Sequence, residues 1–312
     1  MPRYGPDGIF PSEIIEALER AMEDGNGNGV DLDQVLAEVV DRYNYTPQPA
    51  LDGLTPDQAA SLLSSDWLTP GRGVSINQRL TLAGLEHIPL FKYAREFLAF
   101  VRDEGALGVT SRGHLDRKAV ARAMDRLGLE ADVMLIGGAP RKVTNEYDCG
   151  WIGGLRELLE DAALITNRRG FEITTAGLDA LKPERAGMLF AKLFLATTAD
   201  PRTVLEVCDD IDLVLARLPI SVWRLSQHAV RWTEGEDLAW VCWPVAPEAA
   251  VLARSDARGG DNQLGLGTLM FLLHPLTELG LIEERESAFG SSGWKAEYRI
   301  SQLFRQFFEF HI

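Results

Sequence analysis

The sequence predicts a mainly α-helical fold with short β-hairpins, and three observations support this prediction. Apolar residues recur every three or four positions along most of the chain, which is the spacing of one helix face. Clusters of glycine and proline separate these stretches. Short alternating runs beside glycine-bearing turns are typical of two-stranded hairpins. We therefore expect an acidic helical region at 1–75, two helix-and-hairpin units at 76–182, and a helical segment with one further unit at 183–312.

Three helices are expected in the N-terminal region. Ser12 suits the N-cap of the first, whose apolar residues recur on one face. A second helix is expected from about Leu32 to Tyr43. Prolines then interrupt regular structure up to Thr55, which has capping-box spacing with Gln58 and starts the third helix.

Three later segments repeat one order of elements: a helix, a corner, a hairpin or turn-rich stretch, and a new helix. In each segment a leucine is the apolar residue that follows the corner. In the first segment, Asp116 is placed to cap the second helix. The second segment has its hairpin turn at 168–170. The segments are residues 90–129, 151–181 and 267–310, and the corner leucines are Leu107, Leu164 and Leu281.

The passage LLEDAALITNRRGFEITTAG resembles the part of the winged-helix superfamily that runs from the recognition helix into the wing. The resemblance covers roughly 30 residues in each of two places, with a third such segment less alike. It implies a fold in which a helix enters the DNA major groove while the wing tip reaches phosphate. The whole chain also resembles bacterial proteins of unknown function, which implies no activity.

Several further helices are expected between the second and third segments. Two of them have residues that suit helix starts, Pro201 and Ser221.

Composition limits the class of protein. A chain of 312 residues exceeds the size at which a single core usually stops growing, so two or more domains are expected. The apolar runs are too short and interrupted to span a bilayer, and the N-terminus lacks the apolar stretch of a signal peptide. Three widely spaced cysteines suit a reducing cytoplasm, so we expect a cytoplasmic protein without membrane contact.

The net charge of −15 disfavours nucleic acid as a partner, although the charge is unevenly distributed. Residues 1–75 carry 4 basic and 13 acidic side chains, 76–182 carry 15 of each, and 183–312 carry 12 and 18. A DNA-binding regulator would therefore use the neutral middle block. The alternative is that these basic residues are ordinary solvated charges. The candidates are Arg112, Arg117, Lys118, Arg122, Arg141, Lys142, Arg168 and Arg169.

The favoured hypothesis is a non-catalytic protein that acts through protein contacts, as an adaptor or a self-associating regulator. The helix before the second hairpin offers Arg156 among several acids, and acids flank the third hairpin. Either pattern is poor for binding DNA. The aromatic C-terminus is a candidate interface, with the alternative that it packs on its own core. Its residues are Phe304, Phe307, Phe308 and Phe310.

Catalysis has little support in the sequence. The five histidines have no metal-ligand spacing, and no glycine motif has a nucleotide-binding context, so no cofactor is expected. Cys149 precedes a helix, but Asp148 opposes activation of its thiol. An enzyme would need a pocket that gathers distant residues such as His228, Trp232, Trp240 and Cys242.

One stretch has the opening of a calcium loop. Asp24, Asn26 and Asn28 fill the first, third and fifth positions of an EF-hand. The twelfth position is Val35 where a glutamate is needed, and Asp31 has capping-box spacing for the next helix. We therefore keep these three residues only as a weak calcium candidate.

Overall fold

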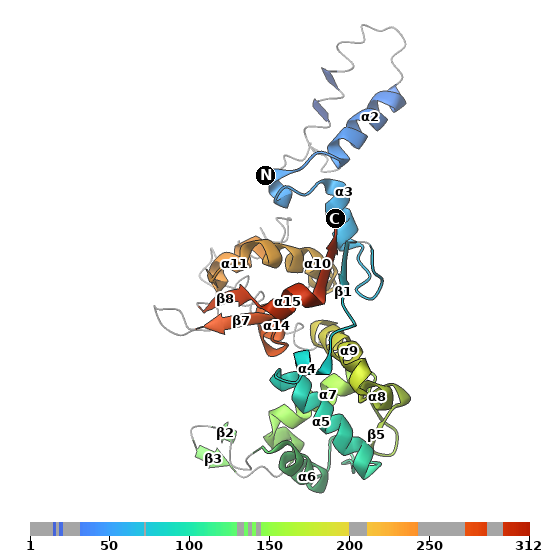
Figure 1. The fold of residues 1–312 in the computed structure, drawn as a ribbon, viewed down its shortest axis with the longest axis vertical. Coiled ribbons are helices and arrows are strands. Elements are labelled where there is room, and N and C mark those ends of the chain that lie inside the picture. The colour runs from blue at the N-terminus through green and yellow to red at the C-terminus, as the bar shows by residue number, and fades with distance from the viewer. Residues whose placement is uncertain are drawn as a thin grey trace.

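The computed structural model describes residues 15–16, 19–20, 32–71, 73–129, 134–136, 139–141, 145–199, 211–242, 272–285 and 296–312. Within these residues the fold is mainly helical, with small antiparallel sheets of two or three strands, as the sequence predicts. The molecule is elongated, and helix α9 (Ala186–Ala199) lies between an upper and a lower body (Figure 1). The predicted first helix, capped by Ser12, falls mostly outside the described residues.

The N-terminal arm follows the predicted order. It contains α2 (Leu32–Asn44), the 3-10 turn η1 (Pro49–Leu51) and α3 (Pro56–Leu63). The predicted capping box is confirmed, because the Gln58 amide donates to the Thr55 hydroxyl at 3.2 Å and the Thr55 amide donates to the Gln58 side chain at 2.9 Å. This reciprocal pair satisfies two of the amides that a helix start leaves without intrahelical partners.

The lower body is one module, residues 89–180, which we call the first module. Leu107 and Phe171 exchange two backbone hydrogen bonds, of 2.9 and 3.1 Å, and so join segments 90–129 and 151–181. The interval 76–182 therefore encloses one module rather than the two units that the sequence suggested. Its elements are α5 (Pro89–Glu104), α6 (Arg117–Leu127), β2 (Met134–Ile136), β3 (Ala139–Arg141), η2 (Glu146–Asp148), α7 (Gly150–Asp161), β4 (Ile165–Asn167), β5 (Phe171–Ile173) and α8 (Thr175–Ala180).

The upper body contains a second module within residues 211–307, whose described helices and hairpin follow one another as those of the first module do. A short strand follows the first helix in each module and pairs with the second strand of the hairpin, Leu107 with Phe171 in one and β6 with β8 in the other. The second module contains α10 (Ile211–His228), β6 (Thr233–Glu234), α11 (Gly235–Cys242), α14 (His274–Glu278), β7 (Ile282–Arg285), β8 (Glu297–Ile300) and α15 (Gln302–Phe307).

The corner between helix and hairpin is built alike in the two modules. Ala163 and Gly280 both have positive φ, 55° and 65°, and each is followed by a fully buried leucine, Leu164 or Leu281. The residue that follows the hairpin, Thr174 or Ser301, donates a hydrogen bond from its hydroxyl group to the backbone of the corner. Thr174 donates to the Ala163 carbonyl at 2.9 Å, and Ser301 donates to the Gly280 carbonyl at 2.8 Å. The resemblance between the second and third segments therefore reflects a repeated architecture.

Helix α10 differs from the prediction. The sequence suggested a helix start at Ser221, but α10 runs continuously from Ile211 to His228 with Pro219 in its interior. Residues 218–225 are all buried, so tertiary packing holds the helix through a proline that removes one backbone hydrogen bond. The predicted start at Pro201 lies outside the described residues.

Helix α9 and the C-terminal aromatic residues form the core that joins the two bodies. The ring of Phe307 lies 4.9 Å from that of Phe190 and 5.3 Å from that of Phe194, both on α9. Phe304, Phe307 and Phe308 are at most 4% exposed. As candidate interface residues these three were wrongly assigned, because an apolar helix end buries itself against the nearest apolar surface of its own chain.

Two short elements close this core. Strand β1 (Gly73–Ile76) pairs antiparallel with β9 (Phe308–His311), which places Val74 opposite Phe310. Phe310, the fourth interface candidate, is partly buried against the same core. Helix α4 (Leu82–Leu85) and the 3-10 turn η3 (Pro183–Arg185) both contact α9.

Two glycines in helices give opposite expectations for alanine. A Cβ at Gly177 would overlap the Leu164 carbonyl oxygen, whereas a Cβ at Gly154 meets nothing within 4 Å. We expect Gly177→Ala to lower the free energy of unfolding by about 1–3 kcal/mol through overpacking. Gly154→Ala should raise it by up to about 1 kcal/mol through helix propensity. Urea unfolding followed by circular dichroism measures both. A Gly177→Ala chain that is no less stable than the parent chain would contradict the packing at Gly177.

Candidate functional site

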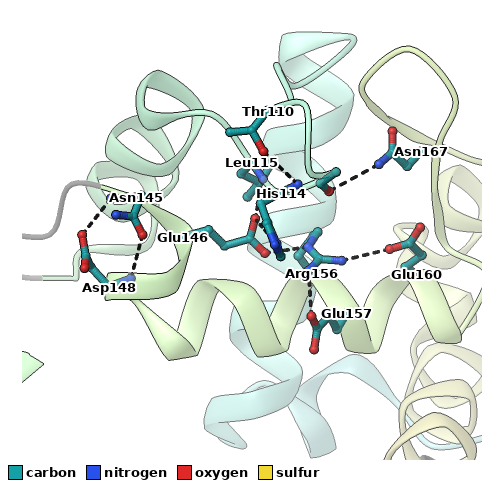
Figure 2. Close-up of polar contacts among 11 residues, drawn as sticks. Thr110, His114, Leu115, Asn145, Glu146, Asp148, Arg156, Glu157, Glu160 and Asn167 are labelled. Atoms are coloured by element: carbon teal, nitrogen blue, oxygen red, sulfur yellow. Dashed lines mark hydrogen bonds and ion pairs between the residues drawn. The ribbon is translucent and has the colours of Figure 1, made fainter. Parts of the chain in front are cut away.

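A buried ion pair lies at the centre of the first module (Figure 2). The Arg156 guanidinium donates through Nε to Glu146 Oε1 at 2.7 Å, and both side chains are less than 10% exposed. The other Glu146 oxygen accepts the backbone amide of Leu115. Arg156 also lies over the ring of Phe171 at 5.1 Å. The pair thus connects the entrance of α6, the turn η2, helix α7 and the hairpin.

All three nitrogens of the Arg156 guanidinium group form ion pairs within this cluster. Its remaining nitrogens reach Glu157 at 2.8 Å and Glu160 at 3.0 Å. Burial alone would lower the pKa of Arg156, but the hydrogen bond and charge of Glu146, with the charges of Glu157 and Glu160, raise it above its ordinary value. The single arginine of α7 therefore points inward and is not available to phosphate or to a base edge.

The basic candidates divide into two groups. Five of them are exposed and make no ion pair within the described residues. These are Arg112, Arg117, Lys118, Arg168 and Arg169. The loop that carries Arg112 touches the hairpin tip, since Asn167 donates from its side-chain amide to the Gly113 carbonyl at 3.4 Å. The structure thus brings Arg112 near the two arginines of the tip.

The other three basic candidates do not join this group. Arg122 pairs with Glu104 of α5 at 3.1 Å. The backbone of Arg141 lies on β3 with its side chain undescribed, and Lys142 lies outside the described residues. The eight candidates are therefore only partly gathered, around the loop before α6 and the tip of the first hairpin.

The outward side of α7 is aromatic. Trp151 in its first turn is 53% exposed, and Tyr147 just before the helix is 88% exposed. The ring of Tyr93 on α5 meets the Trp151 ring edge-on at 5.7 Å. No site residue was expected here. The available sequence signal is that Ile152, Leu155 and Leu159 share the buried face, which turns Trp151 outward.

A second polar cluster joins the N-terminal arm to the second module. Arg224 of α10 is 3% exposed; its Nε lies 3.0 Å from Asp52 Oδ2 and its Nη1 donates to the Val241 carbonyl at 3.1 Å. His228 Nε2 lies 3.5 Å from the same Asp52 oxygen. Burial lowers the pKa of Arg224, and the charge of Asp52 opposes that shift. These contacts hold the turn after η1 against helix α10.

The residues proposed for an enzymatic pocket are only partly brought together. His228 and Cys242 both border the Arg224 cluster. Trp232 instead lies against the guanidinium groups of Arg285 and Arg299, at 4.5 and 4.6 Å from its ring. The side chain of Trp240 is not described. Each of the two arginines also forms an ion pair with a glutamate on the opposite strand of the hairpin, Arg285 with Glu297 and Arg299 with Glu283. The charges on this face therefore neutralise one another.

One trio of residues has the composition of a catalytic triad without its geometry. Ser75 Oγ lies 3.2 Å from His311 Nε2, and Glu309 lies 3.9 Å from the same nitrogen. A triad needs the acid on the opposite ring nitrogen to orient the base. Ser75 is also 1% exposed, so its hydroxyl is closed to a substrate.

The Cys242 thiol is held in its protonated form. Complete burial raises its pKa to about 12, although the charge of Arg224 works in the opposite direction. The unfolded chain would ionise this thiol near pH 9, the ordinary value. Stability associated with the protonated thiol is therefore intact below pH 9 and is lost as pH rises from 9 towards 12.

We expect Cys242 to resist alkylation in the folded chain. At pH 8 a thiol with a pKa near 12 has roughly 1,000-fold less thiolate than one near 9, and the thiolate is the nucleophile. Iodoacetamide labelling of a Cys149→Ala, Cys208→Ala chain, with and without 8 M urea as denaturant, measures the two rates. Equal rates would contradict the burial of this thiol.

Metal and membrane sites receive no support from the described residues. Asp24, Asn26 and Asn28, the weak calcium candidate, lie outside them. In the portion of the chain that is described, no three His, Cys, Asp or Glu side chains are grouped as metal ligands would be. No described helix has the length and apolar character needed to cross a bilayer.

Comparison with known proteins adds no assignment. No family model matches the chain, and no curated protein or solved structure does so.

Proposed function

We propose that the chain is a non-catalytic cytoplasmic protein of two winged-helix-like modules, acting through protein contacts as an adaptor or a self-associating regulator. The observation that carries this proposal is the orientation of α7. This helix occupies the place of a recognition helix, before the hairpin of the first module. Its one arginine is buried against Glu146, while Trp151 faces solvent. Aromatic side chains on an exposed helix face favour a protein partner over DNA.

The winged-helix resemblance is supported by strand order. In each module the strand after the first helix pairs with the second strand of the hairpin, rather than with the first. The order helix, strand, helix, helix, hairpin therefore occurs twice, with part of the second module outside the described residues. We extend the resemblance on this basis to both modules.

Photocrosslinking tests the protein-contact proposal. The photoreactive residue p-benzoylphenylalanine is placed at Trp151, and in a control chain at Leu178, an exposed leucine of α8. In the cells that make this chain, we expect irradiation to give a protein adduct of discrete mass from position 151 and none from 178. No adduct, or one destroyed by nuclease, would overturn the proposal.

A DNA-binding regulator is the second candidate, favoured by the five unpaired basic side chains around the first hairpin tip. With about five phosphate contacts, the slope of log K against log salt concentration should be about −4.5. The combined variant Arg112→Ala, Arg168→Ala and Arg169→Ala should reduce the magnitude of that slope by about 3. Fluorescence anisotropy with a mixed-sequence duplex measures it.

The matched control is Arg122→Ala, because Arg122 is paired with Glu104. It should leave the salt slope unchanged. Absence of binding at low salt would remove the DNA candidate, and light scattering on the same sample reports self-association.

A further inference from the structure

The tip of the first hairpin and the loop beside it form a basic surface on the first module. Asn167 of the hairpin donates to the Gly113 carbonyl of the loop at 3.4 Å, which places the two turns side by side. Nearby, Asp116 caps α6 and Glu172 is half-buried on β5, so exposed positive charge is in excess. We define the basic tip as the five exposed cations here that form no ion pair within the described residues: Arg112, Arg117, Lys118, Arg168 and Arg169.

The complementary charge lies at the other end of the same chain. Residues 1–75 carry 13 acidic and 4 basic side chains. On α2, Glu38 and Asp41 are exposed, three positions apart on one side of the helix, and neither forms an ion pair within the described residues. Figure 1 shows α2 at one end of the elongated molecule and α6, which begins beside the basic tip, at the other. Helix α2 therefore cannot reach the basic tip of its own chain.

Two copies of the chain can satisfy both ends at once. Arranged antiparallel about a twofold axis, each copy places its α2 against the basic tip of the other, which gives a closed assembly. The net charge of −15 does not prevent this association, because charges are screened over about 8 Å at physiological salt. Local complementarity then decides which surfaces meet.

Duplex DNA fits the basic tip less well than an acidic helix does. A winged helix that binds DNA presents cations on its recognition helix as well as on its wing. The one arginine of α7, Arg156, is buried in its ion pair with Glu146, so DNA would be held at the hairpin tip alone. An acidic helix needs only the single basic surface that the first module offers.

We propose that the basic tip of one chain binds α2 of a second copy, so that two antiparallel chains form a dimer. The proposal rests on the proposed function, in its form of a self-associating regulator, and names the partner. Glu38 and Asp41 of the second copy lie beside the cations of the basic tip. Because the contact is electrostatic, its strength falls as salt concentration rises.

Reversal of charge at each surface tests the proposal in the full chain. The tip-reversed variant carries Arg112→Glu, Arg168→Glu and Arg169→Glu, and the arm-reversed variant carries Glu38→Lys and Asp41→Lys. Lysines near the end of α2 suit the helix dipole, so folding of the arm is not impaired. Sedimentation equilibrium at low salt should show the parent chain approaching the mass of two copies. Each reversed variant alone should associate at least about tenfold more weakly, because like charges then face each other.

An equimolar mixture of the two reversed variants should restore the dimer. The acidic tip of one variant then meets the basic arm of the other, and the unchanged tip and arm still match. The control variant reverses three exposed cations that lie outside the basic tip and form no ion pair within the described residues. It has the same net charge as the tip-reversed variant and should dimerise like the parent chain; its changes are Arg79→Glu, Lys92→Glu and Arg305→Glu.

Three results would overturn the proposal. A parent chain that stays monomeric at low salt would do so, and loss of duplex binding in the tip-reversed variant would then assign the basic tip to DNA. Association of both reversed variants at the strength of the parent chain would place the dimer contact elsewhere. A control variant as weak as the tip-reversed variant would make net charge the cause. In each case a photo-adduct from position 151 would still support the proposed function.

Discussion

Replacing Arg156 with methionine is expected to lower the free energy of unfolding by about 3–5 kcal/mol, because it leaves Glu146 buried without its counterion. Glu146 is only 4% exposed and its other oxygen is engaged by the Leu115 amide, so the carboxylate cannot turn to solvent. Urea unfolding monitored by far-ultraviolet circular dichroism gives the change.

Two further variants isolate the buried charge as the cause. Arg122→Met breaks the exposed pair with Glu104 and should cost only about 0–1 kcal/mol. Adding Glu146→Gln to Arg156→Met removes the orphaned charge while keeping an acceptor for Leu115, so it should recover much of the loss. If Arg156→Met cost no more than Arg122→Met, the cluster would not stabilise the module.

Phe307→Ala should be equally damaging, at about 3–5 kcal/mol. The ring is fully buried, and its centroid lies 4.9 Å from that of Phe190, 5.3 Å from that of Phe194 and 4.9 Å from that of Phe308, so a cavity would open between α9 and the C-terminus. Hydrogen exchange should rise on both faces of α9, because that helix is shared by the two modules. Leu178→Ala should change stability by no more than about 0.5 kcal/mol. Exchange that rises in the second module alone would show that the modules are uncoupled.

Local features were predictable from the sequence because the interacting groups are close along the chain. The Thr55–Gln58 capping box, the Asp116 cap and the hairpin turn at 168–170 depend on residues three or four positions apart. The shared corner at Leu164 and Leu281 was also visible as a repeated pattern.

What escaped prediction depends on contacts between distant residues. The bridge from Leu107 to Phe171 turns two apparent units into one module, and no local pattern encodes it. The burial of Arg156 depends on Glu146, which comes from an intervening turn. Ser221 looked like a helix start because serine suits that position, yet the burial of residues 218–225 keeps α10 continuous through Pro219.

The exposed position of Trp151 on α7 was missed for a related reason. Sequence periodicity separates a buried from an exposed helix face, but it cannot tell whether the exposed face will be covered by another element. Only the folded chain leaves Trp151 open while it covers Phe304 and Phe307 with α9. Two aromatic groups that look alike in sequence therefore have opposite environments.

The pairing of β1 with β9 has a consequence for synthesis on the ribosome. Ser75 and His311 are hydrogen-bonded although they are 236 residues apart. At roughly 5–20 residues per second, strand β1 waits about ten to fifty seconds for its partner to be made. All four of its residues are buried in the finished fold. The nascent chain therefore carries an unpaired apolar strand edge until β9 has been made, which is the period when chaperone protection would matter most.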